Sequence, residues 1–107
     1  MSWIIKQATT LTRTMHVDRD LTGATVYFTA KKRPDAILDD SSAIIRKDIV
    51  EHVDAANGDT VLNLTVDDTN VAPGRYKADF RIVFADGSVM QTDVFPLQII
   101  DGVTNRG

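Results

Sequence analysis

A strict alternation of apolar and polar side chains is the feature that most constrains how this chain can fold. From residue 76 to residue 84 every second position is apolar: Tyr76, Ala78, Phe80, Ile82 and Phe84. Successive side chains of a β-strand point to opposite faces, so this period of two predicts a strand buried on one face. Asp86-Gly87 follows directly and predicts a hairpin turn into a returning strand over residues 89–100.

The returning strand changes its phase halfway along. Its first part places Met90, Thr92 and Val94 on one face, whereas its second part continues with Phe95, Leu97 and Ile99. An extra residue in one strand of a pair produces such a shift, so we expect a β-bulge near residues 94–96, at a proline.

Shorter alternating segments fill the rest of the chain. We expect strands over residues 3–7, 10–17, 24–31, 43–53 (broken near Asp48) and 60–66, with a turn at 18–23 and a rim loop at 35–42. Asn57-Gly58 predicts a tight turn because both residue types tolerate positive φ, and residues 67–70 predict a short helical turn. Nothing has helical spacing over three turns.

About seven to eight short strands in 107 residues predict an all-β, antiparallel β-sandwich that forms a single domain over residues 1–107. We expect residues 1–8 to form an edge strand or a docking arm, and 102–107 a tail. Its core should contain eight side chains: Val26, Phe28, Leu62, Leu64, Tyr76, Phe80, Ile82 and Phe84.

Tyr76 makes the prediction more specific, because it begins a central strand directly after the corner Ala72-Pro73-Gly74. Immunoglobulin-like domains place a tyrosine there and tie its hydroxyl to the preceding corner. Ala78 replaces the cysteine of antibody domains, and no mid-chain tryptophan exists. We therefore expect an Ig-like sandwich that is not of the antibody type.

The bulk composition argues against several classes of protein. The net charge is −3 and the basic residues are spread along the chain without a visible basic patch, so we do not expect nucleic-acid binding. There is no apolar run of the ~20 residues that a membrane helix needs. The absence of cysteine and of a signal peptide favours folding in the cytoplasm.

No catalytic constellation is visible, so we expect no enzyme activity, no catalytic residues and no cofactor. Cysteine is absent, and the serines Ser41, Ser42 and Ser88 fall in loops or turns. His16 and His52 lie on strands without a second ligand type at metal spacing, which is typical of exposed or half-buried strand histidines.

Acidic residues occur in three groups, and they could serve either as turn residues or as calcium ligands. They are Asp35, Asp39 and Asp40, then Asp54 and Asp59, then Asp67 and Asp68. Aspartates bond their own backbone in turns, whereas calcium uses the same oxygens at the rims of sandwiches. The spacing of an EF-hand loop is missing, so we favour turn residues and predict no metal site.

Exposed aromatic and apolar residues are the remaining candidates for function. Trp3 with Ile4 and Ile5 either packs back as an edge strand or docks into a neighbouring subunit, since ordering a terminus requires contacts. Tyr27 belongs to the polar half of the strand over 24–31, which is either a working surface or a solvated face. These four residues are the candidate partner interface.

Four stretches in order carry a resemblance: "IIKQATTLTRTMHV", "DLTGATVYFTAKK", "DAANGDTVLNLTVDDT" and "APGRYKADFRIVFADGSVMQTDVFPLQII". Together they resemble the Ig-like N-terminal domain of phage baseplate upper proteins and related phage tail or receptor-binding adaptor proteins. The likeness covers about residues 4–101. Members of that family often continue beyond this domain, and no docking residue transfers from it.

The resemblance implies a non-enzymatic structural protein of a phage or prophage virion, folded in the bacterial host cytoplasm. It would act by protein–protein assembly with other tail or baseplate proteins, or with further copies of itself. The alternative is a carbohydrate- or surface-binding sandwich that uses Tyr27 and rim acids with calcium.

Overall fold

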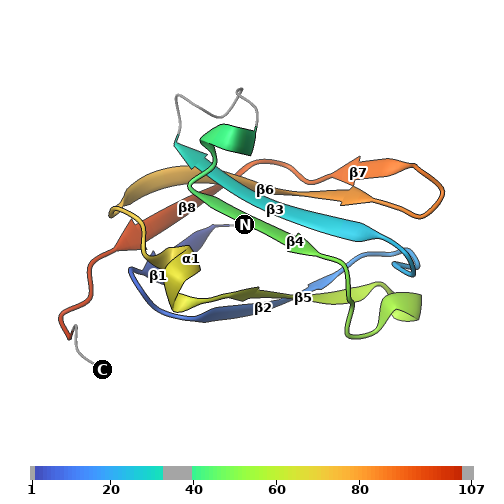
Figure 1. Cartoon of the computed structure of the whole chain (residues 1–107), viewed down its shortest axis with the longest axis horizontal. Coiled ribbons are helices and arrows are strands. Elements are labelled where there is room, and N and C mark those ends of the chain that lie inside the picture. The colour runs from blue at the N-terminus through green and yellow to red at the C-terminus, as the bar shows by residue number, and fades with distance from the viewer. Residues whose placement is uncertain (1, 33–39, 105–107) are drawn as a thin grey trace.

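The computed structural model describes residues 2–32 and 40–104, and it is an all-β sandwich of two sheets (Figure 1). Within these residues the strands are β1 (Trp3–Lys6), β2 (Leu11–His16), β3 (Thr25–Lys32), β4 (Ile45–Ile49), β5 (Asp59–Leu64), β6 (Gly74–Val83), β7 (Val89–Gln91) and β8 (Phe95–Ile100). Three short helical turns accompany them: η2 (Asp40–Ser42), η3 (Ala55–Asn57) and α1 (Val66–Thr69). Most of the predicted rim loop lies outside the described residues.

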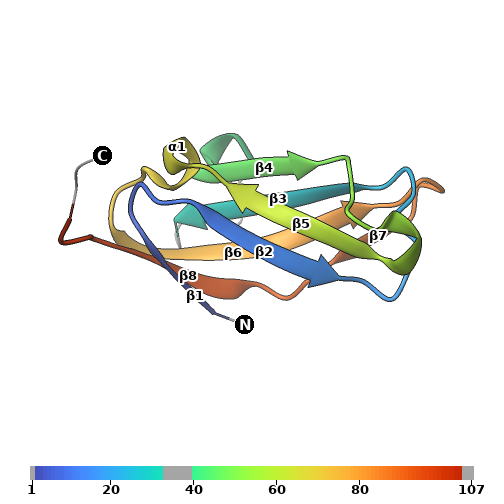
Figure 2. The ribbon, with the colours of Figure 1, turned by 90° about the horizontal axis from the view of Figure 1, so that it is seen from below.

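The order of the strands is that of an Ig-like sandwich. The larger sheet has the order β1-β8-β6-β3-β4, with β7 also paired to β6, and the smaller sheet is the pair β2–β5. Figure 2 shows this pair crossing in front of the larger sheet. Consecutive strands thus change sheets between β1 and β2, between β2 and β3, and again on either side of β5. One detail differs from an all-antiparallel arrangement, because β1 pairs with β8 in parallel.

The eight predicted core side chains are all buried, each at most 6% exposed. The apolar residues of β3 and β6 share the inner face because the register places Phe28 opposite Phe80 and Val26 opposite Ile82. Burying one such side chain stabilises the fold by about 1.5–3 kcal/mol. The sequence prediction missed several equally buried residues: Leu21, Phe95, Leu97, Ile99, Thr60 and Thr69.

The predicted bulge exists but lies slightly earlier than expected. Ala78 pairs with Phe95 and Arg81 with Gln91, so two residues of β6 face three residues of the returning chain. Thr92 occupies the irregular position, where its amide donates to the Phe80 carbonyl and its hydroxyl accepts from the Phe80 amide. The phase shift therefore occurs at residues 92–94, before the proline.

The corner around Tyr76 is as predicted, since its hydroxyl donates to the backbone carbonyl of Ala72. The predicted helical turn is α1, which a capping box opens: Thr65 accepts from the Asp68 amide, and the Asp68 carboxylate accepts from the Thr65 amide. These bonds satisfy two amide groups that a helix start otherwise leaves unpaired.

Two sequence predictions were wrong in detail. β4 is unbroken at Asp48 and ends at Ile49, and Val66 does not continue β5 but begins α1. The tight turn predicted at Asn57-Gly58 is present at the end of η3, although only Gly58 has positive φ. Only the isolated bridge between Asp54 and Asp59 pairs the chain across this turn, because β4 and β5 belong to different sheets.

Candidate assembly surface

The larger sheet has one face that no other described element covers (Figures 1 and 2). We call it the outer face, because its side chains point away from the smaller sheet. The strand registers and the alternation of burial assign these residues to it: Ile4, Lys6, Thr25, Tyr27, Thr29, Lys31, Arg46, Asp48, Arg75, Lys77, Asp79, Arg81, Val83, Val89, Gln91, Pro96, Gln98 and Ile100.

Charge is unevenly divided between the outer face and the rest of the molecule. Among the described strand residues that the registers assign to it, the outer face holds six lysines and arginines and two acidic residues. Both acids, Asp48 and Asp79, lie toward the middle of β4 and β6. Four basic residues of the outer face lie toward the end of the sheet where β1, β3 and β8 end and β6 begins, and we call them the basic corner: Lys6, Lys31, Arg75 and Lys77.

The register of the sheet creates the basic corner. Lys31 and Lys77 lie directly opposite each other on β3 and β6, an arrangement of like charges that weakens a sheet. Arg75 faces Gln98 on β8, and Ile4 faces the same Gln98 from β1. The sequence predicted no basic patch because these residues are far apart along the chain.

The predicted interface residues of β1 are divided between the two faces of the sheet. Trp3 is half-buried inside the sandwich among three phenylalanine rings, and Ile5 is only 3% exposed. Ile4 points the other way and is 66% exposed on the outer face. The expectation that Trp3 packs back as part of an edge strand therefore agrees with the structure, and Ile4 is the exposed member of the group.

A shallow hollow lies beside Ile4, with a volume of about 230 Å³. Arg75, Pro96 and Gln98 line it together with the backbone neighbours of Ile4. An exposed branched side chain next to a hollow and a guanidinium combines an apolar contact with a charge. Such a combination is typical of sites where proteins bind one another.

Tyr27, the fourth predicted interface residue, is half-buried in the middle of the outer face. It lies opposite Asp48 on β4 and opposite Arg81 on β6. The ring of Tyr27 is therefore flanked by one charge of each sign. On β3 it lies four residues before Lys31, the nearest residue of the basic corner on that strand. No described contact favours its predicted role in carbohydrate binding.

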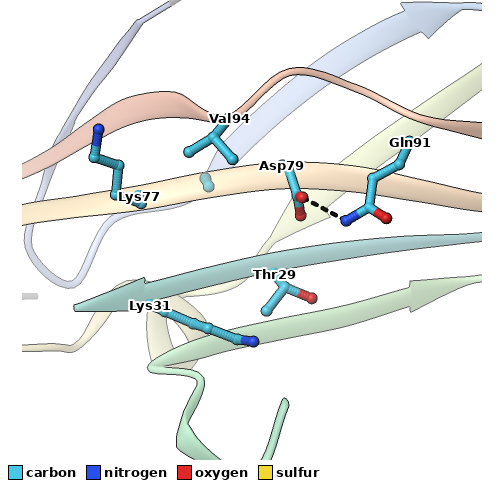
Figure 3. A pocket seen from close by; sticks show the side chains of 7 residues that line it. Thr29, Lys31, Lys77, Asp79, Gln91 and Val94 are labelled. Atoms are coloured by element: carbon cyan, nitrogen blue, oxygen red, sulfur yellow. Dashed lines mark hydrogen bonds between the residues drawn. The ribbon is translucent and has the colours of Figure 1, made fainter. Parts of the chain in front are cut away.

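The bulge opens a second hollow on the outer face, of about 100 Å³ (Figure 3). Lys31 and Lys77 lie toward one end of it, and Val94, which is 56% exposed, stands beside it. At the other end Gln91 donates to Asp79 at 2.7 Å and accepts from Arg81 at 3.0 Å. Asp79 is therefore engaged by Gln91 at that end of the hollow.

The opposite end of the molecule is acidic. The β2–β3 turn, the β4–β5 connection and the β6–β7 hairpin meet there (Figures 1 and 2). They carry six carboxylates and one arginine, and we call them the acidic end: Asp18, Asp20, Glu51, Asp54, Asp59 and Asp86, with Arg19. Arg19 stacks over the Phe84 ring and pairs with Asp86 at 2.8 Å.

Several of these carboxylates are turn residues. Asp20 accepts from the hydroxyl and the amide of Thr22, which lowers its pKa, and Asp86 has a lowered pKa for the same reason through Ser88. Asp54 accepts from the side chain of Asn57. The carboxylates of Asp20 and Asp86 thus stay ionised to lower pH than usual.

The two histidines have different surroundings. His16 lies between the carboxylates of Asp59 (2.7 Å) and Asp18 (3.0 Å). The hydrogen bond with Asp59 contributes most to raising the pKa of His16, and the one with Asp18 adds to it. His52 donates through Nε2 to the Ala24 carbonyl, and its Nδ1 accepts from the buried hydroxyl of Thr60 in that tautomer. His52 therefore ties the β4–β5 connection to β3 and β5.

Within residues 2–32 and 40–104, no group of three or more histidine or acidic side chains is arranged to hold a metal ion. Asp35 and Asp39, part of the predicted rim group, lie outside that range. The described helices include none that is long and apolar enough to cross a membrane. Comparisons with family models, with curated proteins and with solved structures found no match.

Proposed function

We propose that this chain is a non-enzymatic structural module of a phage or prophage virion, which acts by protein–protein assembly in the tail or baseplate. The proposal combines the resemblance of four ordered stretches with the surface just described. It assigns the docking role to the outer face at β1, with Ile4 as its apolar contact residue.

The observation that carries the proposal is the two-sided construction of β1. Trp3 and Ile5 anchor this strand inside the sandwich, while Ile4 between them stays 66% exposed beside a hollow. A rigidly held apolar side chain loses little entropy on binding, so it suits a permanent contact.

The free edges of the larger sheet support the same assignment. β4 carries Arg46, Lys47 and Asp48 at its centre, and charges of this kind protect an edge strand from pairing with other chains. β1 is the other terminal strand of the sheet and has a charge only at its last residue, Lys6. The edge at β1 is therefore the less protected of the two.

The proposal is tested by incorporation into particles. Tail particles purified from the source phage or induced prophage should contain the chain, and Ile4→Asp should remove it from them without lowering its melting temperature. Val66→Asp is the matched control, because Val66 is also exposed but lies on α1. Particles without the chain, or equal losses with both variants, would contradict the proposal.

Binding to carbohydrate is the competing outcome. A thermal shift of the purified chain with a glycan panel, lost in Tyr27→Ala and enhanced by calcium, would replace the assembly role by a carbohydrate-binding one.

A further inference from the structure

β1 is an edge strand that fills part of the core and is joined to the next strand by a tight turn. Trp3 lies among the rings of three phenylalanines, and Ile5 is only 3% exposed. Among the described strands, β1 pairs only with β8. Residues 7–10 then reverse the chain into β2, which belongs to the smaller sheet (Figure 2). β1 is therefore held in place by one strand pairing and one cluster of aromatic rings.

The turn between β1 and β2 is strained at Ala8. Its φ is +57°, and among the described residues it is the only one other than glycine with a positive φ. In this left-handed region the Cβ of an L-residue crowds the following carbonyl oxygen, which disfavours alanine about tenfold relative to glycine. An extended connection from β1 to β2 has no such strain.

The hydrogen bonds around the turn divide at Ala8. On one side, the Gln7 amide donates to the Ile100 carbonyl at the end of β8, at 2.8 Å. On the other side, the Thr9 amide donates to the buried hydroxyl of Thr69 on α1, at 2.9 Å. The Ala8 amide itself makes a longer bond of 3.3 Å to the Thr69 carbonyl. Gln7 is thus fixed together with β1 and Thr9 together with the rest of the fold, which makes Ala8 the place where the chain can change direction.

We propose that two copies of the chain exchange β1, so that the β1 of each copy lies beside the β8 of the other. Ala8 is the hinge, and its backbone changes from the left-handed to the extended conformation. Every core contact of Trp3 and Ile5 is then made between chains instead of within one chain. A second copy is the partner that fits, because the place beside β8 is shaped to β1 itself. This dimer goes beyond the proposed virion role and does not depend on it.

The balance between the monomer and the exchanged dimer is decided at the hinge. β1 contacts the same residues in both forms, so these contacts favour neither. The dimer loses the Ala8 amide bond and a bond from the Thr9 hydroxyl to the Lys6 carbonyl, which is exposed and is replaced by water. In return it relieves the strain at two copies of Ala8. A short hinge under strain favours exchange for this reason.

Exchange should be slow, because opening exposes Trp3 and Ile5 to water. The dimer should therefore form when the chain is refolded from urea at high protein concentration, and it should stay separable from the monomer by size-exclusion chromatography. Light scattering should give the two species masses of 11.8 kDa and twice that value. A chain that refolds to the monomer alone at every concentration overturns the proposal.

Two substitutions at the hinge should shift the balance in opposite directions. Proline holds φ near about −65°, which excludes the closed turn, so Ala8→Pro should fold mainly as the dimer. Glycine removes the strain, so Ala8→Gly should raise the Kd of the dimer about a hundredfold, which is about tenfold for each of the two hinges. An Ala8→Pro chain that is monomeric with the melting temperature of the wild type contradicts the proposal.

Ala85 offers the matched controls, because it lies in the β6–β7 turn, which the Gly87 amide closes by donating to the Phe84 carbonyl. Ala85 is the second residue of that turn, a position that accepts proline. Ala85→Gly and Ala85→Pro should leave the amount of dimer unchanged. Shifts equal to those at Ala8 would show that the hinge has no special role and would refute the proposal.

A disulfide shows which chain supplies β1. Lys6 lies opposite Ile100 on β8, and adjacent strands are about 4.8 Å apart, which a disulfide can span. The chain has no cysteine, so Lys6→Cys combined with Ile100→Cys gives one kind of bond and leaves Ile4 unchanged. After oxidation, the dimer should run as two linked chains on a denaturing gel without reductant, and the monomer as one chain. A dimer that separates into single chains refutes exchange, even where Ala8→Pro fails to fold.

The two proposals fail in different ways. Ile4 stays exposed on the outer face after exchange, because β1 keeps its pairing with a β8 strand. A chain that exchanges β1 but is missing from purified particles refutes the virion role alone. A chain that is found in particles but forms no linked dimer refutes the exchange alone.

Discussion

The indole ring of Trp3 stacks on the phenyl ring of Phe28, with the ring centroids 5.5 Å apart and the planes 20° from parallel. The same indole contacts Phe95 at 5.1 Å and lies under the guanidinium of Arg13 at 5.8 Å. The third residue of the chain is thereby built into the centre of the sandwich. This contact makes β1 a rigid part of the fold and keeps Ile4 at a fixed place on the outer face.

Trp3→Ala should lower the free energy of unfolding by about 3 kcal/mol, because it removes an aromatic side chain from the core and leaves a cavity. For a domain of this size the melting temperature should fall by roughly 10 °C or more. Ile4→Ala, at the neighbouring exposed position, should change the stability by less than about 0.5 kcal/mol. Thermal and urea unfolding measure both, and equal effects would mean that Trp3 is not a core residue.

Tyr76→Phe should cost about 1 kcal/mol, because the Ala72 carbonyl loses its hydrogen bond while the ring stays in place. Tyr27→Phe provides the control, since the hydroxyl of Tyr27 is on the outer face. Urea unfolding with an unchanged slope distinguishes this local loss from a change in the unfolded state. A neutral Tyr76→Phe would show that the corner hydrogen bond contributes nothing.

Gly58→Ala should destabilise the chain by about 3 kcal/mol or more, or prevent folding, since clashes and backbone strain are among the largest mutational effects. A Cβ at Gly58 would lie 1.8 Å from the Val17 carbonyl oxygen, where Val17 also donates its amide to the Gly58 carbonyl. Gly87→Ala has a similar positive φ of +87° but meets no atom within 4 Å. It should cost only about 1–2 kcal/mol, the penalty for a left-handed alanine.

His16 should make the stability depend on pH. Its pKa is raised in the folded state, so its contribution is fully present below the unfolded pKa of about 6.5 and disappears as the pH rises through the folded pKa. The difference in stability between the wild type and His16→Gln should therefore be larger at about pH 5.5 than at about pH 9. Unfolding in urea across this range tests it, and parallel curves for the two proteins would refute it.

Local patterns in the sequence were enough to predict most of the strands and the core. The alternation around Phe80 survives in the structure because each apolar position on β6 meets the inner face of the sandwich. The corner at Tyr76 and the turn at Gly87 were predictable too, since each depends on residues within a few positions. The turn at Gly58 was predictable as well, whereas the hydrogen bond from the Val17 amide to Gly58 follows from the pairing of β2 with β5.

The sequence by itself determined the β-strands, their buried faces and the absence of any long helix in the pattern. Only the tertiary structure decided that Trp3 is part of the core while Ile4 is exposed, because that division depends on the parallel pairing of β1 with β8. It also decided that Lys31 lies opposite Lys77, and that Arg75 lies next to Lys77 on the same face. Side-chain period is a local property of the chain, whereas the neighbours of a surface charge depend on strand order and register, which connect residues that are distant in sequence.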